Sequence, residues 1–245
     1  YRVRLGEGRG EPPSPGEPYN PAYYQRRLRE QGYDVARRWV SEFSDISFLK
    51  TMSKLSGGVY SSLESHDISV VALDGDLWLS KQSEIYPIFK AIWKDSFGYV
   101  DIDFQTFAAF FGKEATDKLD PNVSMALLDK HGALCGYFAL YPDYGPLLAQ
   151  GAVHRIDSSS INFQSHFPLL DKPRILLKTA CVHPKWRRKG LLTAMSVLAC
   201  QRGLNNGYHS PSACMMRDDN HSRRMSGHVS RINPGVPIVS TEYAL

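Results

Sequence analysis

The sequence lacks most of the features that would assign it at once to a specialised class of protein. Its four cysteines, Cys135, Cys181, Cys200 and Cys214, form no C-x-x-C pair. We therefore predict buried free thiols in a reducing compartment and no metal site. No run of residues approaches the ~18 apolar positions of a membrane span, and no N-terminal signal pattern is present. These absences predict a cytoplasmic protein that does not bind a membrane.

The charge balance is also moderate. Twenty-nine Lys and Arg face 25 Asp and Glu, which gives a formal net charge of +4. This excess is small for a nucleic-acid binder. The basic cluster Arg187–Lys189 is accompanied by neither interleaved aromatic residues nor a second basic stripe, so we predict no nucleic-acid partner. A modest positive charge does suit a protein that binds a phosphorylated small molecule.

Composition divides the 245 residues into three segments. Residues 1–18 are rich in Gly and Pro and predict a linker or extended arm. Residues 19–66 predict an N-terminal helical segment, with a helix after the cap Asn20 and another over Phe43–Leu55. Residues 67–245 carry the remaining pattern. Since the chain starts at Tyr1 and not at Met, we expect a fragment or a processed product.

The third segment alternates strand and helix patterns. A helix between two strands favours a parallel pair, whereas the hairpin signal Asp129–Gly132 favours an antiparallel one. The pattern therefore predicts an α/β (α+β) fold with a mixed sheet. The predicted strands are Ile68–Leu73, Val123–Leu128, Leu134–Tyr141, Ile175–Val182, Tyr208–Met216 and Pro237–Ala244. The predicted helices are Lys81–Phe97 after the cap Ser80, an aromatic stripe over Phe104–Phe111, Leu191–Leu204 and Asn220–Gly227.

The most informative stretch is Ala180–Leu192, in which a strand runs through a basic loop into a helix at Gly190. A helix N-terminus presents unpaired N–H groups and the positive end of the helix dipole, and Gly190 lets an anion approach the backbone closely. The residues predict a pyrophosphate cradle. A solvated basic turn before an ordinary helix is the alternative, and the residues alone leave both open.

This stretch resembles motif A of the GNAT superfamily of acetyltransferases: a strand, V-x-P, an aromatic residue, then Q/R-x-x-G-x-G/A. Arg187 matches the Q/R and Gly190 the first glycine, whereas Leu192 stands where the family has a small residue. Asn220 matches the asparagine that opens the helix after the fifth strand. The resemblance extends over 68–243. The N-terminal 18–24 with Gly32-Tyr33 is similar to the start of the C-terminal domain in some two-domain bacterial GNAT-like proteins.

The resemblance implies a mostly antiparallel central sheet flanked by helices, in which the fourth and fifth strands, Ile175–Val182 and Tyr208–Met216, splay apart. Acetyl-CoA or another acyl-CoA would lie in that gap and give its acyl group to an amine. The backbone of Ala180, Cys181 and Val182 would bind the pantetheine. The pyrophosphate would be held by Arg187, Arg188, Lys189, Gly190, Leu191, Leu192 and Thr193, and Asn220 would also contact the cofactor.

The positions of the usual proton-transfer residues of the superfamily carry other residues in this sequence. Where many members of the superfamily have a glutamate base, this strand has Lys178 and Thr179, and the position of the usual tyrosine acid is Gly227. Candidate substitutes are His209 and Tyr243, with the Asp218-Asp219 pair as a further candidate. For each, a purely structural role is the alternative.

Two other functions remain open. Thr179 and His209 are similar in type to the residues with which GNAT-like domains of polyketide assembly lines decarboxylate malonyl-CoA and acylate a carrier-protein thiol. Alternatively, Leu192 and Gly227 favour a degenerate module that binds CoA or a partner without catalysis. The acceptor, an amine or a carrier protein, is not identified; we expect the irregular insert Asp143–Phe167 and the N-terminal arm to shape its pocket.

Overall fold

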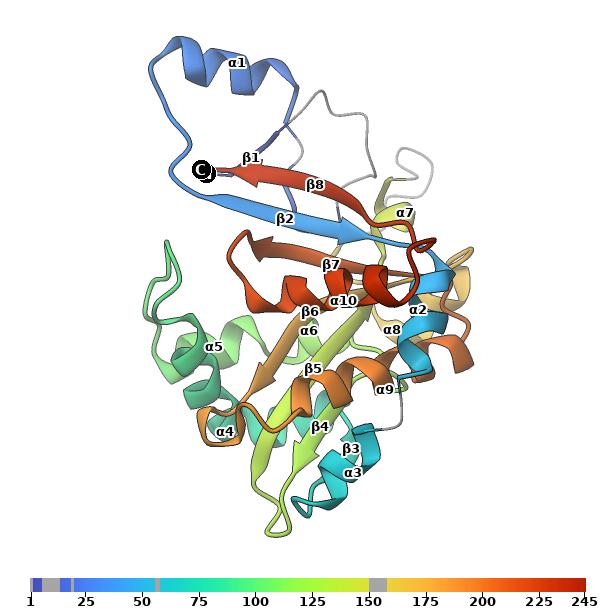
Figure 1. Ribbon diagram of the computed structural model, residues 1–245. Helices are drawn as coiled ribbons and strands as arrows, with labels where there is room; N and C mark the ends of the chain where they lie inside the picture. The colour runs from blue at the N-terminus through green and yellow to red at the C-terminus, as the bar shows by residue number, and fades with distance from the viewer. Residues whose placement is uncertain (1, 6–13, 19, 56–57, 150–157) are drawn as a thin grey trace.

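One mixed sheet organises the computed structural model, which describes residues 2–5, 14–18, 20–55, 58–149 and 158–245 (Figure 1). In this part of the chain the sheet has eight strands in the order β1-β8-β2-β7-β6-β5-β4-β3. Every neighbouring pair is antiparallel except β6 and β7, which confirms the predicted mostly antiparallel sheet. The strands are β1 Val3–Arg4, β2 Arg38–Phe43, β3 Ser69–Ala72, β4 Met125–Leu128, β5 Leu134–Pro142, β6 Arg174–Val182, β7 Ser210–Arg217 and β8 Val239–Ala244.

Helices cover both faces of this sheet, because alternate residues of its central strands are apolar on each side. Phe138 and Leu140 of β5 pack into one apolar cluster with α9 and α2. Tyr137 and Ala139 of the same strand pack into another with α4 and α5. The α-helices are α1 Tyr23–Glu30, α2 Ile46–Ser53, α3 Val59–Glu64, α4 Gly75–Trp93, α5 Phe104–Phe110, α6 Lys113–Thr116, α7 Gly145–Ala149, α8 Phe163–His166, α9 Leu191–Asn205 and α10 Arg224–Ile232. The 3₁₀ turns are η2 Phe167–Leu169, η3 Pro184–Trp186 and η4 His221–Arg223.

The structure corrects the expectation that residues 19–66 are helical. Arg38–Phe43 forms β2, which lies between β7 and β8 and pairs with both. Trp39, Val40 and Phe43 are buried there, so tertiary packing decides this short stretch. The helix predicted over Phe43–Leu55 is shorter and begins after the cap Asp45. The division of the chain at residues 66 and 67 stays a prediction.

Two predicted helix caps are also wrong. Asn20 does not cap α1: its Oδ1 accepts a hydrogen bond from the Arg4 N–H at 2.8 Å, and α1 begins at Tyr23 without a side-chain cap. Ser80 lies inside α4, which begins earlier because Asp74 accepts from the Leu77 N–H at 2.8 Å. Much of the stretch expected to form an arm, residues 6–13, and the middle of the predicted insert, 150–157, lie outside the described residues.

Strands β6 and β7 pair in parallel only from Arg174–Ser210 to Leu177–Ala213. Beyond this point the register of β6 with β5 shifts by one residue at Lys178, and the register of β7 with β2 shifts around Ser41. Such bulges bend a strand and increase its local twist. Met215, opposite Ser41, has a positive φ of 44°. The two strands separate there, which confirms the predicted splay.

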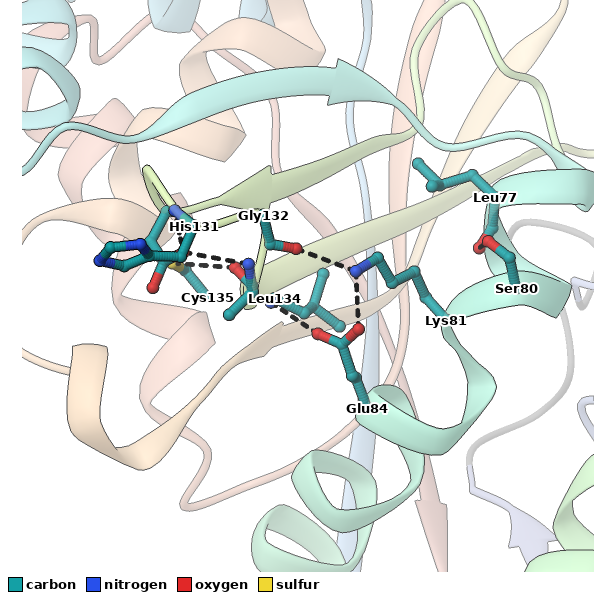
Figure 2. A network of polar contacts seen from close by, with 10 residues as sticks. Leu77, Ser80, Lys81, Glu84, His131, Gly132, Leu134 and Cys135 are labelled. Carbon is teal, nitrogen blue, oxygen red and sulfur yellow. Dashed lines mark hydrogen bonds and ion pairs between the residues drawn. The ribbon is translucent and has the colours of Figure 1, made fainter.

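The hairpin between β4 and β5 is fastened to α4 by a polar network (Figure 2). Lys81 Nζ donates to Glu84 Oε1 at 2.6 Å and to the Gly132 carbonyl at 2.9 Å, while Glu84 Oε2 accepts from the Leu134 N–H at 2.9 Å. Burial would raise the pKa of Glu84, but the hydrogen bonds from Lys81 and Leu134 outweigh it and lower this pKa. The network fixes the turn between β4 and β5 against α4.

A buried carboxylate links the start of β7 to the segment between α6 and β4. Asp120 is fully buried; its Oδ2 accepts from the Tyr208 hydroxyl at 2.8 Å and its Oδ1 from the Asn122 N–H at 2.8 Å. Burial raises the pKa of Asp120 in spite of these hydrogen bonds. The pair Asp120–Tyr208 therefore holds the end at which β6 and β7 stay together.

We predict that Asp120 makes the stability of the protein depend on pH. The folded-state pKa of Asp120 is raised above the unfolded value of about 3.9, so the native state binds the proton more tightly. The stability of the protein therefore falls as the pH rises from the unfolded pKa through the folded-state pKa. Asp120→Asn should gain stability relative to the wild type over the same window, by about 1.4 kcal/mol for each pKa unit. Urea titrations between pH 4 and 8 measure this gain, with Asp95→Asn at an exposed carboxylate as control. Parallel curves for the wild type and Asp120→Asn would contradict it.

Candidate functional site

The basic loop between β6 and α9 has a strained and well-fixed backbone. Arg188 and Gly190 both have positive φ, 63° and 75°. Only glycine adopts this conformation without a steric cost, so Gly190 is required at the start of α9 and Arg188 is held by its surroundings. The His183 N–H donates to the Cys135 carbonyl at 2.9 Å, and the Trp186 N–H to the His183 carbonyl at 2.8 Å. These bonds anchor the first half of the loop.

Helix α3 fixes the second half. Ser62 Oγ donates to the Lys189 carbonyl at 2.6 Å, and a Cβ added at Gly190 would lie 3.0 Å from the same Oγ. His66 places its ring edge against the Trp186 ring, with 6.3 Å between centroids. Lys189 Nζ lies 4.4 Å from the centroid of Trp186. Sequence patterns give no indication of these contacts, since α3 lies more than a hundred positions before the loop.

The N-terminus of α9 has the properties of an anion site. Gly190 caps it without a side-chain hydrogen bond, so the N–H groups of Leu191, Leu192 and Thr193 have no helical partner and no side-chain cap. Lys185, Arg187, Arg188 and Lys189 precede it, and none is within ion-pair distance of a carboxylate in the described part of the chain. Helix dipole and side-chain charge therefore act in the same direction.

Leu192 departs from the family pattern, but its side chain packs against the apolar cluster that includes Met195. Its bulk is thereby directed into the core, and the N–H of this residue remains at the helix start. The structure gives no sign that Leu192 fills the loop.

The backbone of Ala180, Cys181 and Val182 borders the splay. These residues pair with β5 on one side, whereas their pairing with β7 has already ended at Leu177. Strand N–H and C=O groups alternate between the two sides, so part of this backbone faces the gap. Burial raises the pKa of the Cys181 thiol to about 11, which makes it an inert core residue.

Asn220 opens the turn η4 before α10, as predicted. Its Oδ1 accepts from the Ser222 N–H at 2.9 Å. It also lines an open hollow of about 550 Å³ beside α10, in which Glu42 pairs with Arg223 at 3.3 Å. None of the predicted residues from 180 to 193 lines this hollow. The hollow and the splay are therefore two separate features.

The structure does not bring Thr179 and His209 together. His209 is exposed and precedes β7, where its N–H donates to the Pro173 carbonyl at 2.9 Å. Thr179 lies six positions further along β6 than Pro173, which at 3.3 Å per residue puts the two levels about 20 Å apart. His209 lies at the paired end of β6 and β7, away from the splay, and its catalytic role stays a prediction.

Tyr243 is fully buried on β8, which is separated from β7 by β2. Its hydroxyl donates to Glu17 Oε2 at 2.9 Å, and burial raises the pKa of Tyr243. The sequence pattern places Tyr243 on the last strand, but it does not reveal that β2 lies beside this strand or that Glu17 bonds to the hydroxyl. Among the described residues no group of three or more His, Cys, Asp or Glu side chains forms a metal site, and no helix is long and apolar enough to cross a membrane.

The contact between α3 and the loop leads to a testable expectation. Ser62→Ala leaves the Lys189 carbonyl without its donor and should weaken acetyl-CoA binding about two- to tenfold, as expected for one hydrogen bond. Ser61→Ala is the matched control, because Ser61 Oγ bonds within its own helix to the Gly58 carbonyl. Calorimetric titration of both variants measures the difference. Equal affinities would show that the loop holds its shape without Ser62.

Comparisons with known proteins agree with this geometry. No family model matches the sequence, and no curated protein matches it. Among solved structures, a fungal multi-domain GH3 β-N-acetylglucosaminidase with a GCN5-related glucosamine N-acetyltransferase region superposes with a TM-score of 0.53 at 10% identity, over 99% of this chain and 25% of that one. A tandem GNAT protein from the clavulanic acid biosynthesis pathway gives a TM-score of 0.51 at 11% identity, over 100% of this chain and 63% of that one. The chain thus spans less than two thirds of either structure, and it has the fold of the GCN5-related N-acetyltransferases.

Proposed function

We propose that the protein transfers an acetyl or similar acyl group from acyl-CoA to an amine. One observation carries the proposal: β6 and β7 separate next to a basic loop that leads into an uncapped helix N-terminus. This arrangement offers an anion site and an unpaired strand edge within one short segment. The proteins of similar structure include N-acetyltransferases, and this similarity supports the same reaction.

The chain's own groups then have distinct tasks in this proposal. The N–H groups of Leu191, Leu192 and Thr193, with Arg187, Arg188 and Lys189, neutralise the pyrophosphate. The backbone of Ala180, Cys181 and Val182 binds the pantetheine, and an N–H at this edge stabilises the negative charge on the thioester oxygen as the amine attacks. One such donor contributes on the order of 3 kcal/mol to transition-state stabilisation in other enzymes. Asn220 stays a predicted contact of the cofactor, although it lines the separate hollow beside α10.

The three candidate residues for proton transfer lie at different distances from the gap between β6 and β7. Thr179, half-buried on the splayed part of β6, is the predicted catalytic residue that lies nearest to the gap. Tyr243 lies on β8, and its hydroxyl bonds to Glu17 and not to a residue of the splay. His209 lies at the paired end of β6 and β7. The polyketide-type alternative, malonyl-CoA decarboxylation with transfer to a carrier-protein thiol, requires Thr179 and His209 together and loses support from this separation.

A second candidate is a module that binds CoA without catalysis. It is favoured by the absence of an evident base on β6 and by Gly227, an exposed glycine of α10, at the position of the usual tyrosine. The two candidates differ in turnover: both bind acetyl-CoA, but only the enzyme releases CoA thiol faster in the presence of an amine.

The proposed function is tested by a thermal-shift titration with acetyl-CoA, malonyl-CoA and free CoA. A ligand that binds only the folded state stabilises it by about 2.7 kcal/mol at one hundred times its Kd. Gly190→Trp introduces a bulky side chain at the start of α9, against Ser62, and should abolish this stabilisation. Gly207→Trp is the matched control, since Gly207 has a similar φ of 79° in open space at the other end of α9.

The control matches the positive-φ strain of Gly190→Trp but not its contact with Ser62. The melting temperature of each variant without ligand therefore separates loss of folding from loss of binding. Unaltered acetyl-CoA binding by a folded Gly190→Trp protein would remove the anion site from the loop. A preference for malonyl-CoA would return the decarboxylase to consideration.

A further inference from the structure

The described residues Ser14–Pro18 form a tight turn on the sheet. The Glu17 N–H donates to the Ser14 carbonyl at 3.0 Å, and Glu17 Oε2 accepts from the Ser14 N–H at 2.8 Å. Ser14 is only 2% exposed although it belongs to a Gly- and Pro-rich stretch that composition alone marks as a solvated linker. We refer to residues 14–18 as the covering turn.

The covering turn contacts all four strands around the splay. On the β2 and β8 side, Glu17 accepts hydrogen bonds from the hydroxyls of Ser41 and Tyr243. Ser14 Oγ accepts from Cys214 Sγ of β7 at 3.2 Å. On the other side of the gap, the Pro15 carbonyl accepts from Lys178 Nζ of β6 at 3.3 Å.

Lys178 and Cys214 lie just beyond the last parallel pair, Leu177–Ala213, one on each strand. The turn therefore spans the gap at the point where it opens. The bulges that separate the strands are also the places to which the turn is attached.

The covering turn lies on the face opposite α10. Glu42 of β2 directs its carboxylate to Ser226 of α10 and to Arg223 of η4, the turn just before this helix. Its neighbour Ser41 donates to Glu17, and successive residues of a strand point to opposite faces. Helices α9 and α10 cross in front of the sheet in Figure 1, so the covering turn lies behind it.

The turn is held by polar contacts. None of its residues belongs to the apolar clusters of the described chain. Segments with few apolar contacts open at low free-energy cost. The Glu17 carboxylate makes the largest share of these contacts, because it accepts hydrogen bonds from Ser14, Ser41 and Tyr243.

We propose that the covering turn closes the acceptor side of the acyl site and must leave before a primary amine can reach the thioester. The inference rests on the proposed function: acyl-CoA enters from the face of α9, so its carbonyl lies in the splay and the nucleophile approaches from the opposite face. Glu17 is then the latch of the turn. In the latched state the protein binds acyl-CoA but transfers its acyl group slowly.

The thiol of Cys214 reports directly on the turn, since Ser14 contacts it and the other three cysteines are buried. Alkylation of Cys214 by iodoacetamide in the full chain is followed by mass spectrometry for the wild type, Glu17→Ala and Glu17→Gln. Glu17→Ala should label about tenfold faster, because hydrogen bonds to a charged group are lost. Glu17→Gln removes the same charge but keeps one acceptor oxygen, so its rate should fall between the two. It therefore controls for the effect of charge on the thiol.

The same variants are assayed for acetyl-CoA affinity by calorimetry and for CoA thiol release with spermidine as a simple polyamine probe. We expect Glu17→Ala to release thiol several-fold faster than the wild type with unchanged acetyl-CoA affinity. Slower release with unchanged affinity would overturn the latch, because it would place Glu17 in the chemistry.

Equal labelling of the wild type and Glu17→Ala, or of the two variants, would also overturn the latch while leaving acetyl-CoA binding and the proposed function intact. Absence of acetyl-CoA binding by all three proteins would instead remove the proposed function, and the latch with it.

Discussion

Hydrogen bonding between β6 and β7 stops after the Leu177–Ala213 pair, and the candidate site depends on this interruption. A continuous ladder would satisfy the backbone of Ala180–Val182 and leave no place for an extended ligand. The interruption is built into both strands, since β6 has its bulge at Lys178 and β7 its positive φ at Met215. Because the strands remain paired at one end, the gap has a fixed apex.

The surrounding elements stabilise the two halves of this gap separately. Tyr208 and Asp120 hold the paired end through a buried hydrogen bond. At the open end, α9 starts immediately after a loop that α3 fixes through Ser62 and Lys189. Backbone strain at Arg188 and Gly190 is tolerated there because these contacts hold the loop from several sides. The backbone of the proposed anion site is thus held in place by the protein's own contacts.

Sequence patterns anticipated the parts that depend on local physics. The strand that ends at Val182, the glycine at the start of α9 and the helix itself follow from periodicity and from the need for a positive φ. Strand β2 was missed, because its six residues adjoin a helical pattern and their burial comes from β7 and β8. The bulges were also missed, since they depend on the register with a partner strand.

The positions of the catalytic candidates also depend on strand pairing, which the local sequence pattern does not predict. Tyr243 was correctly assigned to the last strand, yet its position relative to the splay is set by the insertion of β2 beside it. His209 was predicted at the start of the strand Tyr208–Met216 and lies just before β7, but a strand pattern does not indicate where pairing with β6 stops. Glu17 carries no signal at all in a Gly- and Pro-rich stretch; only the folded sheet places three donors around its carboxylate.

The position of β2 has a consequence for the way the sheet forms. Arg38 pairs with Ala244 and Phe43 with Val239, so the ladder joins segments that are far apart in the sequence. Closing so long a loop costs conformational entropy before any hydrogen bond compensates for it, and folds rich in such distant contacts fold slowly. While the chain is being synthesised, the apolar residues of β2 stay without partners until β7 and β8 have emerged. The half of the sheet that bears the covering turn is therefore the last to be completed.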